Sequence, residues 1–400
     1  MNYDFTIIGA GIIGLSVGLE LTKRYKNSKI LILEKEDTIS AHQTGRNSGV
    51  IHSGIYYDPN SLKAKLSKKG SEQIKKFSDE HGISYDICGK IIVASNSSEL
   101  ENLNNLFQLG RENNLKVKKV NQTDIKQIEP HLTQAIEGIY VPSTGIINYQ
   151  ELSRKFADII VNQGGDIKLK QTVKDIKKVE DRIKISTQNT QVNTRNLINC
   201  TGLMSDRITK LAGIHTNAKI VPFRGEYYEL KPNKRHLVKN LIYPVPNPDF
   251  PFLGVHFTRT MNGKILVGPN AVPSFKREGY KKTSFNIKDT LDTISYPGFW
   301  RLASKYMGEG TKELYRSFNK KAFLKNVKQY IPAINEDDLI PAKAGVRAQA
   351  LDEQGNLIDD FFIVKDKNMI HVCNAPSPAA TASIEIGKEI VNRSQCNFSI

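Results

Sequence analysis

A glycine-rich turn near the N-terminus constrains the fold of this chain more than any other feature. The stretch YDFTIIGAGIIGLSVGLELTKRY, residues 3–25, begins with a short apolar run and continues with leucines at helical spacing. Gly9, Gly11 and Gly14 lie at the junction in the pattern G-x-G-x-x-G. The first glycine of this pattern permits a tight turn, the second lets backbone approach a pyrophosphate, and the third lets the helix pack on the strand. The pattern predicts a strand, a turn and a helix whose N-terminus faces phosphates.

An acidic residue follows at the spacing that a bound nucleotide requires. SKILILEKE, residues 28–36, is typical of a second buried strand, and Glu34 lies twenty residues beyond Gly14. A carboxylate at this point can accept hydrogen bonds from ribose hydroxyls and disfavours a 2′-phosphate. We therefore predict a dinucleotide-binding unit.

The segment after Glu34 indicates which dinucleotide binds. A nicotinamide dehydrogenase of this plan would continue with further strand and helix units. Here the chain continues with DTISAHQTGRNSGVIHSGIYY, residues 37–57, which is irregular and rich in glycine. A loop in this place suits a longer cofactor, so we expect FAD.

Composition limits the remaining classes. The 400 residues favour two domains, and the mean hydropathy of −0.39 is typical of a soluble globular protein. We find no basic and apolar signal region at the N-terminus and no apolar run of about 20 residues, so we expect a cytoplasmic protein. The four cysteines lack the spacing of metal or disulfide sites, and we expect no metal.

Several blocks of sequence resemble one family across nearly the whole chain. They are RNSGVIHSGIYY at 46–57, SLKAKLSKKG at 61–70, PFRGEYYEL at 222–230, YPVPNPDFPFLGVHFTR at 243–259, AGVRAQALD at 344–352 and NAPSPAATASIEIG at 374–387. With these blocks the chain resembles the D-amino-acid oxidase-like flavoproteins and, within them, the L-2-hydroxyglutarate oxidase/dehydrogenase family. The resemblance implies FAD-dependent oxidation of L-2-hydroxyglutarate to 2-oxoglutarate, with hydride transfer to the flavin. The alternative is oxidation of an amino acid or of another 2-hydroxy acid.

The same resemblance implies an α/β fold, α+β overall, in which a Rossmann-like FAD-binding domain is interleaved with a mixed-sheet substrate domain. We assign residues 1–80, 145–213 and 331–400 to the FAD-binding domain and residues 81–144 and 214–330 to the substrate domain.

Two histidines are candidates for the base that takes the hydroxyl proton, because the ordinary pKa of histidine lies near the working pH. His52 and His256 both lie in the narrow sequence blocks, and we place His52 slightly ahead. A structural role for either histidine is the competing interpretation.

A dicarboxylate substrate needs cationic groups, and arginine matches the geometry of a carboxylate. Arg259 and Arg347 are the leading candidates, and Arg347 resembles the arginine that grips the substrate carboxylate in the superfamily. Tyr57, Tyr243 and Arg224 rank second.

The cofactor-binding residues implied by the fingerprint and the family blocks form one set. They are Gly9, Gly11, Gly14, Glu34, Arg46, Asn47, Ser48, Val173, Thr201, Gly202, Ser377, Ala380 and Thr381. We expect PSPAATAS, residues 376–383, to begin a helix beside the flavin pyrimidine, where backbone N–H groups stabilise negative charge.

The net charge of +16 favours anionic partners. Nucleic acid is not expected, because no recognition motif is present and the charge is spread. Aromatic and aliphatic residues alternate with many basic residues over 299–330. This segment fits either a core-packed helix pair with a basic outer face or a peripheral contact with the inner face of the cell membrane. We expect oxygen or a membrane quinone to accept the flavin's electrons.

Overall fold

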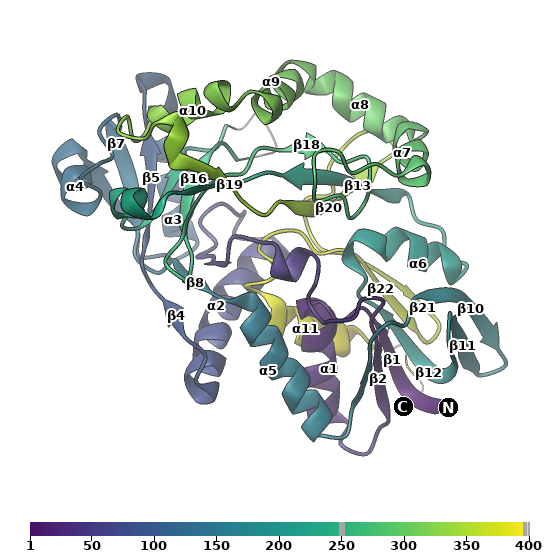
Figure 1. Cartoon of the computed structure of the whole chain (residues 1–400). Coiled ribbons are helices and arrows are strands. Elements are labelled where there is room, and N and C mark those ends of the chain that lie inside the picture. The colour runs from purple at the N-terminus through teal and green to yellow at the C-terminus, as the bar shows by residue number, and fades with distance from the viewer. Residues whose placement is uncertain (248–252, 395–397, 399–400) are drawn as a thin grey trace.

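The computed structural model describes residues 1–247, 253–394 and 398 and has two large sheets (Figure 1). The first sheet has a parallel centre in the order β22-β12-β1-β2-β9. Its strands are β1 (Asn2–Ile8), β2 (Ile30–Leu33), β9 (Asp166–Lys168), β10 (Val173–Val179), β11 (Arg182–Thr187), β12 (Gln191–Asn199), β21 (Phe362–Asp366) and β22 (Met369–Asn374). The strand, turn, helix and second strand predicted for residues 3–36 are therefore confirmed.

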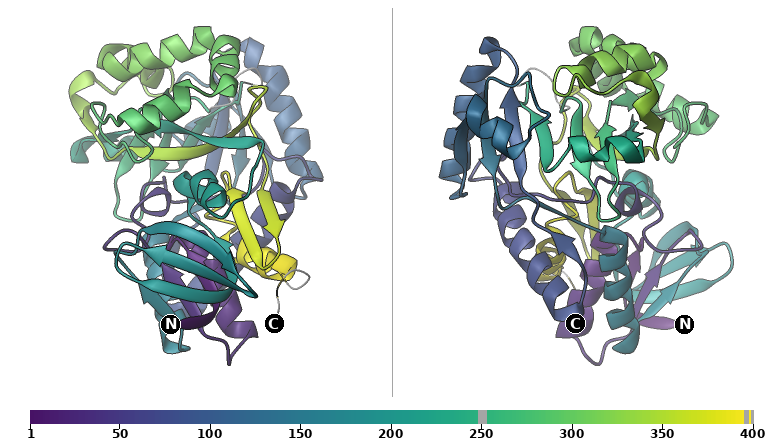
Figure 2. Two further views of the ribbon diagram at one scale, coloured as in Figure 1. Left: turned by 90° about the vertical axis from the view of Figure 1, so that its right-hand side faces the viewer. Right: turned by 60° about the vertical axis from the view of Figure 1, so that its left-hand side comes forward.

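Helices cover one face of this sheet and a β-meander covers the other. The side chains of α1 (Ile12–Arg24), α2 (Leu62–His81), α5 (Tyr149–Asn162) and α11 (Ser383–Ser394) share one core with β1 and β2. The meander β10–β11–β12 and α6 (Ser205–Leu211) form a second core on the opposite face. The right-hand view of Figure 2 places α2 and the meander on opposite sides of this half of the molecule.

The second large sheet has the order β19-β14-β17-β16-β15-β5-β7-β6. Its strands are β5 (Lys90–Ala94), β6 (Lys118–Asn121), β7 (Glu137–Val141), β14 (Tyr228–Leu230), β15 (Leu241–Pro244), β16 (His256–Arg259), β17 (Ile265–Gly268) and β19 (Leu339–Pro341). The helices α3 (Leu100–Glu112) and α4 (Gln122–Ile128) lie against β5, β6 and β7.

Two small sheets complete the architecture. One joins β13 (Ala218–Gly225), β18 (Val272–Pro273) and β20 (Gly345–Asp352), and the other joins β3 (Val50–Ile51), β4 (Tyr85–Asp86) and β8 (Gly145–Ile147). The segment expected as a helix pair contains three helices, which follow α7 (Ile287–Ile294) across the top of Figure 1. They are α8 (Pro297–Lys305), α9 (Met307–Phe318) and α10 (Lys320–Lys328).

The strand pairing crosses our domain boundaries at two points. β4 lies in the range 81–144 that we assigned to the substrate domain, but it pairs with β8 of the range 145–213. β19 and β20 lie in the range 331–400 that we assigned to the FAD-binding domain, but they pair with β14 and β13 of the range 214–330. The division into two domains stays a prediction.

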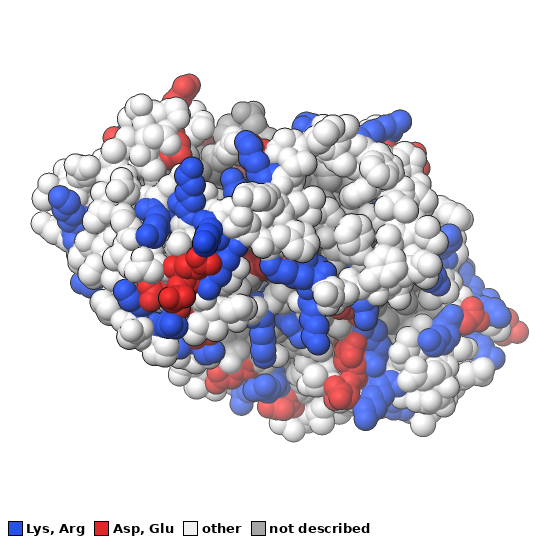
Figure 3. Space-filling view, turned by 45° about the horizontal axis from the view of Figure 1, so that its top comes forward, with Lys and Arg blue, Asp and Glu red and all other residues white. Residues whose placement is uncertain are grey.

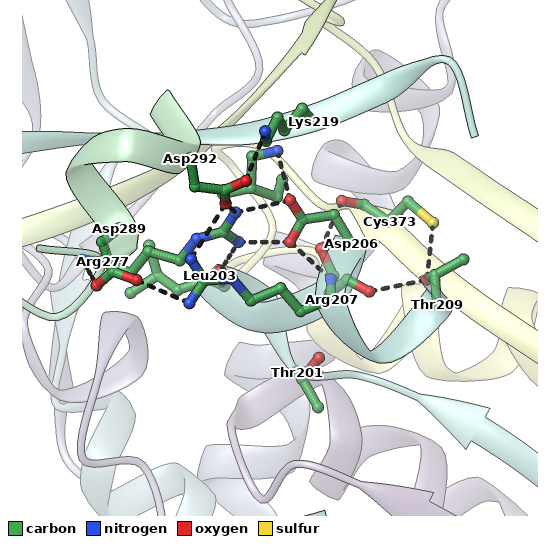
Figure 4. A network of polar contacts seen from close by, with 12 residues as sticks. Thr201, Leu203, Asp206, Arg207, Thr209, Lys219, Arg277, Asp289, Asp292 and Cys373 are labelled. Atoms are coloured by element: carbon green, nitrogen blue, oxygen red, sulfur yellow. Dashed lines mark hydrogen bonds and ion pairs between the residues drawn. The ribbon is translucent and has the colours of Figure 1, made fainter. Parts of the chain in front are cut away.

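The helices α7, α8, α9 and α10 together form a helical layer. A buried ion-pair network connects α6 to α7, the first helix of this layer (Figure 4). The Arg277 side chain is almost fully buried, and its Nη2 donates to Asp206 at 2.8 Å and to Asp292 at 2.9 Å. Its Nη1 also donates to the carbonyl of Leu203 at 2.7 Å. Because a buried guanidinium needs every one of these acceptors, the network fixes how α6 meets α7.

Candidate active site

The glycine turn after β1 is packed closely enough to require glycine at two of its three positions. Gly9 has φ of +103°, and a Cβ at Gly14 would lie 1.9 Å from the carbonyl oxygen of Gly9. A Cβ at Gly11 would meet only the hydroxyl of Thr44, at 3.5 Å. The same hydroxyl accepts a hydrogen bond from the N–H of Ile12 at 3.0 Å. Gly9 and Gly14 are therefore required by the backbone conformation and packing of the turn. Among the described residues, by contrast, no atom other than the Thr44 hydroxyl fills the space beside Gly11.

Glu34 lies at the carboxyl end of β2, where nucleotides bind in parallel sheets. Its carboxylate is buried and accepts hydrogen bonds from the N–H of Ala10 at 2.8 Å and of Glu36 at 3.0 Å. These bonds hold the acid against the glycine turn.

The residues near this turn fit a bound FAD. The Nε atom of Arg46 is buried and has no hydrogen-bond partner within the described part of the chain. The Arg46 guanidinium stacks on the ring of Tyr280 at 3.7 Å, and one of its Nη atoms reaches the carbonyl of Ala344. A donor fixed in this way suits an acceptor group that the protein itself does not supply.

Other predicted cofactor residues have local partners. The amide of Asn47 donates to the carbonyl of Thr44 at 2.7 Å and accepts from the N–H of Gly49 at 2.8 Å, so it holds the loop together. Ser48, next along this loop, is partly buried. Val173, at the start of β10, belongs to the same buried core as Leu33.

Thr201 and Gly202 follow β12 at the edge of the same sheet as the glycine turn. The hydroxyl of Thr201 donates to Asn199 at 2.7 Å, and Gly202 has φ of +53°. A Cβ at Gly202 would lie 2.8 Å from the amide nitrogen of Gln43, so the loop of residues 37–57 passes directly over this turn.

The same loop also contacts the turn before α11. The buried hydroxyl of Thr381 accepts from the N–H of His52 at 3.1 Å and lies 2.9 Å from the hydroxyl of Tyr149. The hydroxyl of Tyr57 is hydrogen-bonded to Ser377. Ala380 lies in this turn, whereas the helix itself begins at Ser383, the last residue of the expected stretch.

His256 has a fixed tautomer. Its Nδ1 lies 2.9 Å from the carbonyl of Gly254, so Nδ1 carries the proton and donates, and Nε2 keeps its lone pair. The ring stacks on Tyr243 with centroids 4.1 Å apart. Burial and the charges of Arg347 and Lys90 lower the pKa of His256 to about 3, although the bond to Gly254 acts in the opposite direction. The imidazole is therefore neutral near pH 7.

His52 has a similar electrostatic setting. Burial, Lys90 and His256 together lower its pKa to about 3. The structure thus brings both predicted histidines into one electrostatic cluster, although they come from the loop after β3 and from β16.

Arg347 enters this cluster from the small sheet. It lies on β20 opposite Phe223, and its side chain is hydrogen-bonded to Tyr227. Its charge acts on both Tyr243 and His256. A guanidinium in this position can bind a carboxylate.

Arg259 does not join the cluster. It lies three residues beyond His256 on β16, and because successive side chains of a strand point to opposite faces, it lies on the other face of the sheet. Its guanidinium donates to the carbonyl of Lys239 at 2.6 Å and lies 3.7 Å from Asp86. Our prediction of Arg259 as a substrate clamp is not supported by this position.

Sequence reasoning missed three residues of the cluster, Lys90, Tyr56 and Tyr227. Tyr56 and Tyr227 lie inside blocks that carry the family resemblance, which was the available signal. Lys90 opens a strand and resembles an ordinary solvent-facing lysine, yet it is buried.

One group of possible metal ligands lies beside the cofactor strand. Glu36, His42 and Glu278 converge within reach of one ion. However, the ammonium of Lys35 lies 2.9 Å from His42 and 2.8 Å from Glu278, so a cation of the protein already neutralises these acids.

Comparison with known proteins identifies the family. A profile described as FAD dependent oxidoreductase matches residues 4–393. The L-2-hydroxyglutarate dehydrogenase of Indibacter alkaliphilus is 47% identical over 97% of this chain and 97% of its own length. That of Escherichia coli K12 is 43% identical over 98% of this chain and 93% of its own length.

Similarity to solved structures is evidence for the fold only, because the sequence identities are low. The L-alpha-glycerophosphate oxidase of Mycoplasma pneumoniae with FAD bound superposes with a TM-score of 0.81 at 21% identity, covering 98% of this chain and 94% of the other. Glycine oxidase of Geobacillus kaustophilus gives 0.77 at 15% identity, covering 100% of this chain and 96% of its own. The expected Rossmann-like fold and the FAD cofactor are confirmed. This chain belongs to the FAD-dependent oxidoreductases and, within them, to the L-2-hydroxyglutarate dehydrogenase family.

Proposed function

We propose that this protein oxidises L-2-hydroxyglutarate to 2-oxoglutarate. The family supports this proposal, and one observation of the structure carries it. Two neutral histidines and Arg347 lie in one cluster where the second sheet meets the loop of residues 37–57. Such a cluster supplies the base and the cation that oxidation of a 2-hydroxy acid requires.

The residues at the end of the first sheet would hold the cofactor. Glu34 would bind the ribose of FAD, and the backbone at Gly11 would approach its pyrophosphate. Arg46, Thr201 and the turn of residues 376–382 would contact the rest of the cofactor. FAD supplies the hydride acceptor when it is bound. The chain's own residues bind and orient the substrate, and they remove its hydroxyl proton.

His256 is the better candidate for the base. Its Nδ1–H is held by Gly254, so Nε2 is the atom that accepts a proton. A substrate carboxylate bound at Arg347 would offset the cation that lowers the pKa of His256, which raises the basicity of Nε2 when substrate is present. His52 is then the second candidate, and Tyr243 and Tyr57 position the substrate.

Anaerobic flavin bleaching tests the proposed reaction. The purified FAD-loaded protein is mixed with L-2-hydroxyglutarate, D-2-hydroxyglutarate, L-lactate, glycine and L-proline, and absorbance is followed without oxygen. Reduction by L-2-hydroxyglutarate far faster than by the others is expected. An amino acid that reduces the flavin faster would displace the proposal in favour of the alternative reaction. Adding oxygen or a quinone analogue to the reduced protein then identifies the acceptor.

We also propose a peripheral contact between the helical layer and an anionic membrane. Large apolar side chains of this layer are exposed, and Figure 3 shows Lys and Arg spread among uncharged side chains on the face that includes the top of Figure 1. The exposed side chains are Ile287, Leu291, Trp300, Met307, Tyr315 and Phe318. Apolar and basic groups on one face are typical of peripheral membrane binding, and this would place a quinone acceptor near the protein. No helix of residues 1–247 and 253–394 has the length and apolarity needed to span a bilayer.

Vesicle sedimentation tests this contact. Binding to vesicles with anionic lipid is expected to fall for a double variant, Trp300→Ser with Phe318→Ser. Val161→Ser is the matched control, because Val161 is an exposed apolar residue on α5, away from the helical layer. Equal binding by both variants would reject the contact. Fractionation of gently lysed cells at low salt tests whether the protein lies in the cytoplasm or on the inner face of the membrane.

A further inference from the structure

Lys90 is a buried lysine that faces aromatic rings. Its side chain is 1% exposed, among the largest fully buried side chains of the described residues. The ammonium lies 4.3 Å from the ring centroid of Tyr56 and 5.1 Å from that of Tyr243. Cation–π contacts of this kind stabilise an ammonium only in part.

Comparison with Lys63 shows what Lys90 lacks. Lys63 is also buried and lies 5.4 Å from the ring of Tyr57, but its ammonium is paired with Asp359 at 2.7 Å. Among the described residues no carboxylate acts on Lys90. Burial alone lowers the pKa of Lys90 to about 7. A buried cation without a counter-ion is costly, so its retention indicates an anion that comes from outside the protein.

The position of Lys90 links it to the candidate site. β5 pairs with β15 so that Lys90 lies beside Leu241, and Tyr243 and Lys90 are on the same face of the sheet. The Tyr243 ring contacts His256 on one strand and the Lys90 ammonium on another. The charge of Lys90 acts on both His52 and His256.

A second donor lies next to Lys90. The hydroxyl of Tyr56 is buried and has no hydrogen-bond partner among the described residues. An ammonium and a neighbouring hydroxyl, neither of them satisfied by the protein, match the two oxygens of one carboxylate.

We propose that Lys90, with Tyr56, binds one carboxylate of a dicarboxylate substrate while Arg347 binds the other, which makes Lys90 a specificity-determining residue. This inference rests on the proposed function, because it assigns the second carboxylate of that substrate. The two cations come from different sheets, β5 and β20, and both act on His256. The hydroxyl-bearing carbon would then be held near the histidine by both ends of the molecule.

Binding of unreactive acids to the full-length, FAD-loaded protein tests the inference. Glutarate carries two carboxylates and butyrate carries one, and each is titrated while the flavin absorption spectrum is recorded. Lys90→Met is expected to weaken glutarate about 100-fold and butyrate less than threefold. Tyr56→Phe is expected to weaken glutarate by a smaller factor, and Lys90→Arg is expected to restore part of the affinity. Lys264→Met is the matched control, because Lys264 is an exposed cation beside the same sheet and is paired with Glu229.

Proton uptake on ligand binding distinguishes a lysine that binds the carboxylate from a lysine that only stabilises the fold. The groups facing Lys90 are the two tyrosines, which stay neutral, and the two histidines, whose pKa values are about 3. With a pKa of about 7, Lys90 is about half protonated at pH 7, and a bound carboxylate raises this pKa. Calorimetry in buffers of different ionisation enthalpy is expected to show about half a proton taken up per glutarate at pH 7. Uptake is expected to vanish in Lys90→Met.

Three results would overturn the inference. They are equal weakening of glutarate and butyrate, loss of FAD as the main effect of both Lys90 variants, or unchanged proton uptake in Lys90→Met. The proposed function fails separately: if glutarate binding depends on Lys90 but L-2-hydroxyglutarate does not reduce the flavin, the carboxylate site stands and the reaction does not.

Discussion

Two glycines of the same turn are expected to respond differently to one added methyl group. Gly14→Ala would place a Cβ 1.9 Å from the carbonyl oxygen of Gly9 and 3.4 Å from the Cβ of Cys200. Ordinary contacts begin near 3.4 Å, so α1 must move away from β1 by more than an ångström. Because the atom it meets is backbone at the centre of the first sheet, we expect a loss of about 3 kcal/mol or more in the free energy of unfolding.

Gly11→Ala is the contrasting change. Its Cβ would lie 3.5 Å from Thr44 and would meet no other atom closely, and the backbone of Gly11 has an extended conformation that alanine adopts freely. We expect the stability of the cofactor-free protein to change by less than about 1 kcal/mol. The methyl group would, however, occupy space that the pyrophosphate needs, at a cost of about 1–3 kcal/mol. FAD affinity is then expected to fall about 5- to 150-fold.

Two measurements separate these outcomes. Urea unfolding of the cofactor-free proteins gives the free energy of unfolding, and titration of flavin fluorescence gives the affinity for FAD. The reasoning fails if Gly14→Ala unfolds like the wild type, or if Gly11→Ala loses as much stability as Gly14→Ala.

Three further predictions concern the base, the ion-pair network and a buried histidine. His256→Gln is expected to slow anaerobic flavin reduction about 10²- to 10⁴-fold with normal FAD content, and an unchanged rate in stopped flow would exclude it as the base. Arg277→Met is expected to lower the free energy of unfolding by about 3 kcal/mol, because it leaves Asp206 without its buried cation while Asp292 keeps Lys219 and Arg207, and a loss below about 1 kcal/mol in urea would contradict this. Burial lowers the pKa of His371 to about 4. Since the unfolded chain binds this proton below about pH 6.5 and the folded chain does not, stability is expected to fall by up to about 3 kcal/mol as pH drops from 6.5 to 4. His371→Asn should make that part of a pH series of unfolding curves less steep, while the fall that His52 and His256 cause remains, and a fall as steep as in the wild type would assign the effect elsewhere.

Local patterns predicted the first sheet well. The glycine fingerprint and the strand that precedes Glu34 both depend on neighbours in the sequence, and the structure has each of them. Their periodicities of 3.6 and 2 are direct consequences of backbone geometry.

The candidate site was harder to predict, because its residues come from strands far apart in the sequence. Lys90 is buried by Tyr56 of the earlier loop and by Tyr243 of β15, a strand that pairs with β5 from about 150 residues later. Side chains along a strand point alternately to its two faces, so residues three positions apart point to opposite faces. This rule alone predicts that Arg259 and His256 lie on opposite faces of the sheet. β19 and β20 crossed our domain boundary because their partners lie more than a hundred residues earlier.

The order in which the first sheet is assembled has a consequence for synthesis of the protein. β1 and the glycine turn leave the ribosome first, but β22 pairs with β12 and α11 packs on α1, and both come from the last 32 residues. The part of α1 that packs on α11 therefore stays uncovered in the nascent chain while more than 300 residues are added. Chaperone dependence and aggregation are expected to be greatest in this interval.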